Sequence, residues 1–327
     1  MTGGWVRVML HASAASLVLL GLISGMVLFL VYLERRILGR FQARIGPNRV
    51  GPWGLLQTTA DAVKLLTKED IIPSEADRIL FVLAPLVVFF GTAMAFAVIP
   101  AGPRLVLTDF GVGVLFVVAM GSLAMLGYLM AGWASHSKYS LLGGMRAVAQ
   151  LVSYELPLTL ALLGVVILAG SLSTTRIVEA QRHGWFILLQ PLGFFIYFTA
   201  GLAEINRSPF DLPEGESELI GGYHTEYSGM RWALFFLAEY AGVFSLSALA
   251  VTFYLGGWLG PWLPGPVWFL GKTFTLVFVI IWLRGTWLRP RLDQLMDFSW
   301  KVLLPLAMLN LGLTAAEVYL LRWMGVA

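Results

Sequence analysis

Apolar residues occur in long runs along this chain, and short polar stretches separate the runs. Eight runs are long and apolar enough to cross about 30 Å of hydrocarbon as helices. They lie at residues 12–33, 79–99, 110–133, 147–169, 185–203, 232–256, 267–283 and 302–321. The seventh is the shortest and contains Lys272 near its start. The pattern predicts an all-α, polytopic membrane fold in a single transmembrane domain, residues 1–327.

The composition agrees with a membrane protein. Hydrophobic residues make up 58% of the chain and charged residues only 13%, whereas a soluble domain carries about 25% charged residues. The first apolar run is longer than the core of a signal peptide and lacks a small-residue cleavage site, so we interpret it as a span. Because the chain has no cysteine, disulfides and thiolate ligands to iron–sulfur clusters are excluded.

The positive charges predict an orientation. Sixteen of the 22 Lys and Arg residues fall in the loops after the first, third, fifth and seventh runs. Such loops face the cytoplasm, and an even number of spans places both termini on the outer side. The net charge of +3 is therefore interpreted as topological and not as a nucleic-acid surface.

A second, shorter helix is predicted in the loop between the first two spans, at about residues 53–68 after Pro52. Its apolar and polar residues fall on opposite faces, which favours a helix lying in the membrane interface. Asp61 is on the polar face and either pairs with Lys64, three residues on, or has a role of its own. The turn before this helix holds Arg44 and Arg49 among glycines and prolines, and these arginines could be purely topological.

Two acids lie inside predicted spans, Glu155 in the fourth and Glu239 in the sixth. A charge there costs several kcal/mol, so it indicates a role or a partner. Pro157 lacks an N–H group and leaves the carbonyl of Ser153 without its helical donor, which favours bound water beside Glu155. The two acids could carry protons, or each could pair with a cation of a neighbouring helix.

The cytoplasmic loop at residues 204–231 is unusually acidic. Glu214, Glu216 and Glu218 alternate along it, as if they lined something, and the turn Ser208-Pro209-Phe210 is predicted to be rigid. Carboxylates held close share protons and titrate as a set, although clustered acids in loops are often only solvated. The acids and the single arginine of the cluster are Glu204, Arg207, Asp211, Glu214, Glu216, Glu218 and Glu226.

The sequence shows no redox centre or nucleotide site of its own. The four histidines are at span ends or in loops, and no two have metal-ligand spacing. There is no P-loop and no dinucleotide fingerprint. The chain thus has acids that could handle protons but no group that could carry electrons.

Four long segments resemble one family, the H-type membrane subunit of respiratory complex I, the proton-pumping NADH:quinone oxidoreductase. The resemblance extends from about Glu34 to Asn310. The segments are "ERRILGRFQARIGPNRVGPWGLLQTTADAVKLLTKE", "WASHSKYSLLGGMRAVAQLVSYELPL", "AEINRSPFDLPEGESELIGGYHTEYSGMRWALFFLAEY" and "WLRGTWLRPRLDQLMDFSWKVLLPLAMLN".

The resemblance implies a site and a set of partners. The subunit would form part of a chamber for a quinone substrate and couple quinone reduction to proton translocation. Partner subunits of complex I, namely iron–sulfur subunits of the peripheral arm and antiporter-like membrane subunits, would hold FMN and the iron–sulfur clusters, and this chain would bind no cofactor and no metal. The family resemblance also implies a prokaryotic cytoplasmic membrane. Matching chamber positions are Arg44, Asp61, Arg207, Asp211, Glu214, Glu216, Glu218, Glu226 and Arg284, and Glu155, Glu204 and Glu239 would form the proton path.

Two other functions fit the buried acids. An ion-coupled carrier would use them too, but carriers usually show inverted repeats and none is evident here. The related subunit of a membrane-bound hydrogenase shares the acidic loop, but the segments "RIGPNRVGP" and "FDLPEGESELIGGY" favour the quinone enzyme.

Some members of the family carry a further carboxylate in the third span, whereas residues 110–133 of this chain are all uncharged.

Overall fold

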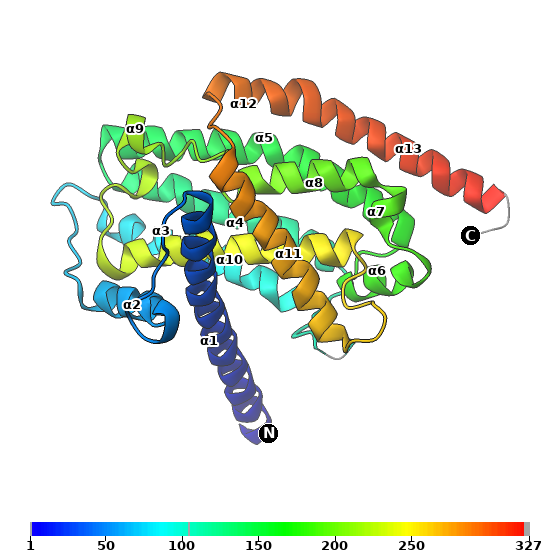
Figure 1. Ribbon diagram of the computed structural model, residues 1–327, viewed down its shortest axis with the longest axis horizontal. Coiled ribbons are helices and arrows are strands. Elements are labelled where there is room, and N and C mark those ends of the chain that lie inside the picture. The colour runs from blue at the N-terminus through cyan, green and yellow to red at the C-terminus, as the bar shows by residue number, and fades with distance from the viewer. Residues whose placement is uncertain (1, 104, 324–327) are drawn as a thin grey trace. The chain divides into compact units, whose positions relative to one another are not determined.

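The protein is described by a computed structural model covering residues 2–103 and 105–323, and the side chains of residues 2–12, 216, 217, 321 and 322 lie outside the description. Its regular elements over these residues are all helices (Figure 1). Seven of them are long and apolar enough to cross a membrane. This confirms the all-α, polytopic fold. The chain divides into two units, Met1–Lys68 and Glu69–Ala327.

The first unit is a long helix followed by a short one. Helix α1 spans Thr2–Phe41, a single turn η1 spans Pro52–Gly54, and α2 spans Gln57–Thr67. The predicted helix at 53–68 therefore begins four residues later, because Trp53 has a φ of 53° and interrupts the helical path. Pro52 opens η1 and not α2. Leu56, Val63 and Leu66 are exposed, as a helix lying in a membrane interface requires.

The polar contacts of the first unit fix its loop. Tyr32 on α1 donates a hydrogen bond to the carbonyl of Trp53 at 3.0 Å. Arg35 reaches Asp61 on α2 at 2.5 Å, so Asp61 pairs with Arg35 and not with Lys64 as the local spacing suggested. The carboxylate also accepts a bond from Gln57.

The second unit is a bundle of long helices joined by short ones (Figure 1). The long helices are α3 (Arg78–Ala95), α4 (Gly113–Ala134), α5 (Lys138–Ala169), α8 (Pro191–Glu204), α10 (Gly229–Tyr254), α11 (Gly265–Thr286) and α13 (Leu304–Trp323). The short ones are η2 (Phe96–Val98), α6 (Thr174–Ala180), η3 (Gln181–His183), α7 (Phe186–Leu189), α9 (Glu216–Leu219), η4 (Gly222–His224), α12 (Leu292–Phe298) and the π-helical η5 (Ser299–Leu303).

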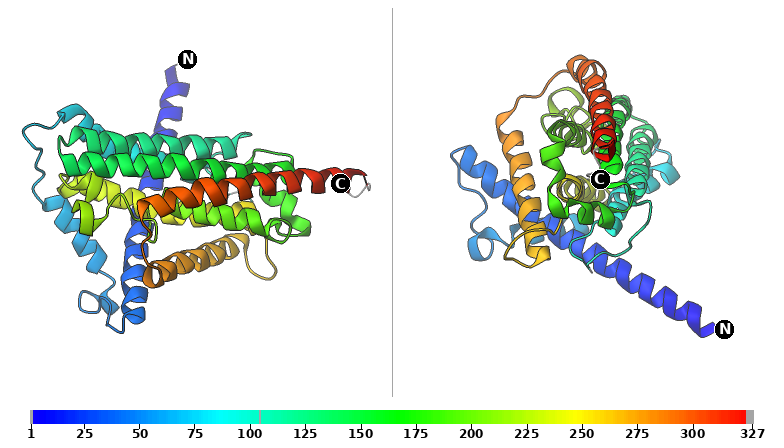
Figure 2. Two further views of the ribbon diagram at one scale, coloured as in Figure 1. Left: turned by 90° about the horizontal axis from the view of Figure 1, so that it is seen from above. Right: turned by 90° about the vertical axis from the view of Figure 1, so that its right-hand side faces the viewer.

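Close packing joins α3 to α4, α4 to α5, and α5 to both α8 and α13 (Figure 2). Glycines bring the helices together: a Cβ at Gly127 would lie 3.0 Å from the carbonyl oxygen of Ala84, and one at Gly132 only 2.7 Å from that of Ser140. Small residues at such crossings are typical of membrane bundles, where backbones must approach closely to gain van der Waals contact.

The fifth predicted span, residues 185–203, is not one helix. Helix α7 ends at Leu189, Gln190 is non-helical with φ −126° and ψ 59°, and Pro191 opens α8. The residue before a proline avoids the α-helical region, which explains the break. The 14 residues of α8 would extend only about 21 Å. Buried Gln190 also donates to Thr314 on α13 at 2.6 Å, so a polar contact holds the break in the bundle.

Pro157 leaves the carbonyl of Ser153 without its helical donor, and a hydroxyl from another part of the chain donates a hydrogen bond to it. Ser299 in η5 donates to that carbonyl at 2.6 Å, and Trp300 donates to the Ser153 hydroxyl. Tyr154 donates to the carbonyl of Leu295 in α12 at 2.9 Å. The chain segment before α13 thus supplies a donor to this carbonyl from 146 residues away, and the water predicted beside Glu155 stays a prediction.

Lys272 has a local explanation. Its ammonium donates to the carbonyls of Leu255, Gly257 and Leu259, at 2.7, 3.2 and 2.7 Å, and lies over the ring of Trp185 at 4.4 Å. These carbonyls follow the end of α10, where a helix leaves acceptors without intrahelical donors and its dipole favours a cation. The charge near the start of α11 is thus a cap for α10.

Candidate functional site

The acidic loop after α8 is folded and held by a buried glutamine. Gln150 on α5 is fully buried and donates to the carbonyls of Ala203 and Phe210, both at 2.8 Å. The Ser208–Pro209 peptide bond is cis, and the backbone of Phe210 bonds back to Arg207. The turn around Ser208-Pro209-Phe210 is therefore ordered, as its residues predicted.

Arg207 and Glu239 form a buried ion pair. Arg207 follows α8 and Glu239 is on α10, and their side chains are only 5% and 12% exposed. The guanidinium bonds the carboxylate and lies over the ring of Tyr240, 4.3 Å from its centroid. Glu239 therefore pairs with a cation, which was one of the two roles considered for it from the sequence. The cation comes from the loop and not from another spanning helix. Removing one member of such a pair leaves an uncompensated charge.

Glu214 faces inward from the loop. Tyr223 donates a hydrogen bond to its carboxylate at 3.1 Å, and the His224 ring approaches the same oxygen at 3.9 Å. Burial raises the pKa of Glu214 well above its ordinary value, the negative charges of Glu239 and Asp211 add to the rise, and Arg207 opposes it. Burial lowers the pKa of His224 to about 4. His224 is therefore neutral near pH 7, and burial favours the neutral form of Glu214 as well.

Asp211 lies at a second cluster of charges. Arg289, in the segment after α11, bonds it at 2.9 Å. Burial raises the pKa of Asp211, while the positive charges of Arg289, Arg284 and Arg207 oppose that rise. The other oxygen of Asp211 is buried without a hydrogen-bond partner. Arg284, in the last turn of α11, is therefore close enough to Asp211 for its charge to act on that carboxyl group.

Glu214 and Glu218 have different surroundings, although they belong to the same alternating set. Glu218 is 58% exposed and pairs with Arg146 on α5 at 2.6 Å, and this hydrogen bond lowers its pKa. The side chain of Glu216 lies outside the described residues. Residues 216–219 form the turn α9 and not an extended strand. Glu226 is half-buried between η4 and α10.

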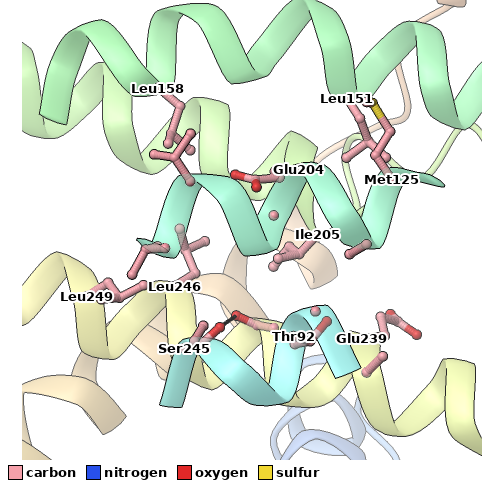
Figure 3. Close-up of a pocket in the computed structure, with 18 of the residues that line it drawn as sticks. Thr92, Met125, Leu151, Leu158, Glu204, Ile205, Glu239, Ser245, Leu246 and Leu249 are labelled. Carbon is pink, nitrogen blue, oxygen red and sulfur yellow. Dashed lines mark hydrogen bonds between the residues drawn. The ribbon is translucent and has the colours of Figure 1, made fainter. Parts of the chain in front are cut away.

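A cavity of about 100 Å³ lies between α3, α4, α5, α8 and α10 and contains two of the predicted acids, Glu204 and Glu239. Thr92, Tyr128 and Ser245 add polar groups to walls that are otherwise apolar. In Figure 3 Leu158 of α5 and Leu246 and Leu249 of α10 lie toward one end of the cavity, and Glu239 lies toward the other. One water needs about 10–15 Å³ of such space, so the cavity has room for several waters.

Glycine at position 121 makes room for Glu204. A Cβ built on Gly121 of α4 would lie 2.5 Å from Oε1 of Glu204. The next residue, Ser122, donates a hydrogen bond to Glu155 on α5. Helix α4 therefore contacts Glu204 and Glu155 through neighbouring small residues, although it has no carboxylate of its own. Glu155 has a hydroxyl partner, and no cation is found bonded to it among the described residues.

Two predicted site residues, Arg44 and Asp61, belong to the first unit. Arg44 is exposed and bonds Gln42, and Asp61 pairs with Arg35. Sequence reasoning missed Gln150, Arg289, Arg146 and Ser122. Arginine at 289 was counted only as a topological charge, and a lone Gln or Ser in a span gives no pattern to detect. Among the described residues, no group of three His, Asp or Glu side chains could hold a metal ion.

Comparison with known proteins gives a consistent result over nearly the whole chain. The model of the NADH dehydrogenase family matches residues 14–315. The H-type subunit of NADH-quinone oxidoreductase from Dehalococcoides mccartyi is 53% identical over 97% of this chain and 89% of its own length. The corresponding protein of Geobacillus kaustophilus is 52% identical over 96% of both chains.

Proposed function

Since this chain belongs to the family of the H-type subunit of NADH-quinone oxidoreductase, a multi-pass membrane component of complex I, we propose that it forms part of the quinone chamber and couples quinone reduction to proton translocation through buried carboxylates. Its partners are the other subunits of that complex. FMN, the iron–sulfur clusters and the quinone's electron donor belong to those subunits. In this proposal the chain lies in the bacterial cytoplasmic membrane, with both termini on the outer side.

The observation that carries the proposal is the cavity shared by Glu204 and Glu239. Carboxylates are costly in a spanning bundle, and these two come from different helices to one cavity that has room for water. From the cavity, Glu239 bonds Arg207 of the loop, and Glu204 lies within reach of the charge of Glu155. The acids thus form a sequence from the acidic loop into the membrane part of the unit.

Charge changes at the loop have a physical route to this sequence. Reduction of a quinone to a quinol takes up two electrons and two protons, so it changes the charge of its surroundings. Arg207 bonds Glu239 and also attracts Glu214 and Asp211. A proton gained or lost by Glu214 changes how strongly Arg207 is held toward the loop, and Glu239 then gains or loses its counter-ion. Coupled networks of this kind respond as a unit.

The quinone end of the proposal rests on the charge pair of Asp211 and Arg289. Arg289 is 34% exposed on its side chain and Asp211 is 18% exposed, so the pair is reachable from the loop surface. The guanidinium can donate to a carbonyl oxygen of the quinone, and the carboxylate can accept from a hydroxyl of the quinol. The chamber itself would be completed by partner subunits.

The test uses the assembled complex in proteoliposomes, with NADH:quinone turnover and proton uptake measured together. Glu155→Gln should lower the protons translocated per NADH while the complex still assembles. Glu179→Gln, at an exposed glutamate paired with Arg182, is the matched control. Arg289→Ala should raise the KM for quinone, with the exposed Arg291→Ala as its control. Equal proton yields in both glutamate variants, together with equal KM values in both arginine variants, would refute the proposal.

A further inference from the structure

Helix α4 contacts two acids of the proposed path, Glu155 and Glu204, and yet has no Asp or Glu along Gly113–Ala134. Glu155 is on α5, and Glu204, at the end of α8, reaches Gly121 of α4. The negative charge of Glu155 acts on Glu204, so the two carboxyl groups are close enough to influence each other. The polar group that α4 contributes at this point is the hydroxyl of Ser122.

The Ser122 hydroxyl has two acceptors for a single hydrogen. Its oxygen is 3.2 Å from the carbonyl oxygen of Val118, one helical turn earlier, and it also bonds Oε1 of Glu155. A serine O–H can donate only one bond at a time, but its oxygen can accept another. Back-bonding to the i−4 carbonyl is the ordinary state of a serine within a helix. The two geometries therefore coexist at the cost of a rotation about one bond.

These two positions match the two protonation states of Glu155. When Glu155 is a carboxylate, the Ser122 hydroxyl donates to it. When Glu155 is a carboxylic acid, its O–H donates to the Ser122 oxygen, and the serine hydrogen turns to Val118. The carboxyl group is hydrogen-bonded in both states, and no buried donor loses its partner as the proton arrives or leaves.

We propose that Ser122 is a positioning residue of the proton path, a hydroxyl switch through which α4 holds Glu155 in both protonation states. It is the polar group by which α4, a helix without Asp or Glu, contacts Glu155. The proposal rests on the proposed function for its role in pumping, but the bond between Ser122 and Glu155 can be tested without it.

The control comes from the same fold. Ser247 on α10 is fully buried and donates to the carbonyl of Val243 at 2.9 Å. It has the same i−4 geometry as Ser122 with no carboxylate bonded to it among the described contacts. Ser247→Ala therefore removes an equivalent hydroxyl from the bundle, and any general effect of that loss appears in it.

The experiment is infrared difference spectroscopy of the assembled complex, oxidised minus reduced, in H₂O and D₂O, with proton yield measured on the same preparations. Glu155→Gln identifies the carboxyl C=O band of Glu155. Ser122→Ala should move that band to higher wavenumber and lower the proton yield. Ser122→Thr keeps a hydroxyl that can bond the i−4 carbonyl and should restore both, and Ser247→Ala should change neither.

The outcomes separate the two proposals. A Glu155 band at the same position in wild type and Ser122→Ala would overturn the hydroxyl switch, whatever the proton yield. A band that moves in Ser122→Ala and returns in Ser122→Thr supports it. If Glu155→Gln pumps normally, the proposed function fails at Glu155, and the switch then loses its role in pumping.

Discussion

Replacing Gly121 with alanine should displace the Glu204 carboxylate and lower the proton yield of the complex. The added Cβ would lie 2.5 Å from Oε1 of Glu204, whereas ordinary contact begins at 3.4 Å. The carboxylate oxygen must therefore retreat by about 0.9 Å from the cavity wall formed by α4. Outside α4 itself, that Cβ meets only the carboxyl group of Glu204 within 4 Å, so the movement falls on this side chain.

The size of the effect follows from this displacement. A misplacement of about 1 Å at a working group can cost up to about 100-fold in rate, so we expect a loss of roughly tenfold to 100-fold in proton transfer. Helix stability should not suffer, because alanine is about 1 kcal/mol better than glycine inside a helix. The variant should assemble and lose coupling.

The assay measures NADH oxidation and proton uptake of the reconstituted complex. Gly312→Ala in α13 is the control, since a Cβ there meets nothing within 4 Å. Adding Glu204→Asp to Gly121→Ala draws the carboxylate back by about one C–C bond, about 1.5 Å, and should recover part of the loss. A proton yield in Gly121→Ala equal to that of Gly312→Ala would refute the reasoning, as would strictly additive losses in the double variant.

Two further predictions concern stability. Burial lowers the pKa of His224 from 6.5 to about 4. Between these pH values the unfolded chain binds a proton at His224 more readily than the folded chain does. The free energy of unfolding should therefore fall as pH drops from 6.5 toward 4, by up to about 3 kcal/mol. His224→Asn should therefore lose less thermal stability between about pH 7 and about pH 5 than wild type, and equal losses would contradict this. Lys272→Met leaves three carbonyls after α10 without their donor and should cost about 1–3 kcal/mol, seen as a lower melting temperature; an unchanged melting temperature would mean that the cap contributes nothing.

Local pattern was sufficient for the fold class and for the presence of the candidate acids. Long apolar runs can bury their backbone in lipid only as helices, so the composition and run lengths predicted the spanning helices. The cost of a charge in a bilayer marked Glu155 and Glu239 without any knowledge of their neighbours. Proline at 157 likewise predicted a carbonyl without its helical donor. These features depend on residues that are adjacent along the chain.

The partners of those groups were decided by the tertiary structure alone. The carbonyl of Ser153 is bonded by Ser299, Asp61 by Arg35, and Asp211 by Arg289. Glu214 and Glu218 look equivalent in the sequence, but one is buried against Tyr223 and the other faces Arg146. Periodicity along a chain specifies which face of a helix is polar, but it carries no information on which distant face that helix packs against, and the pairing of buried charges depends on that packing.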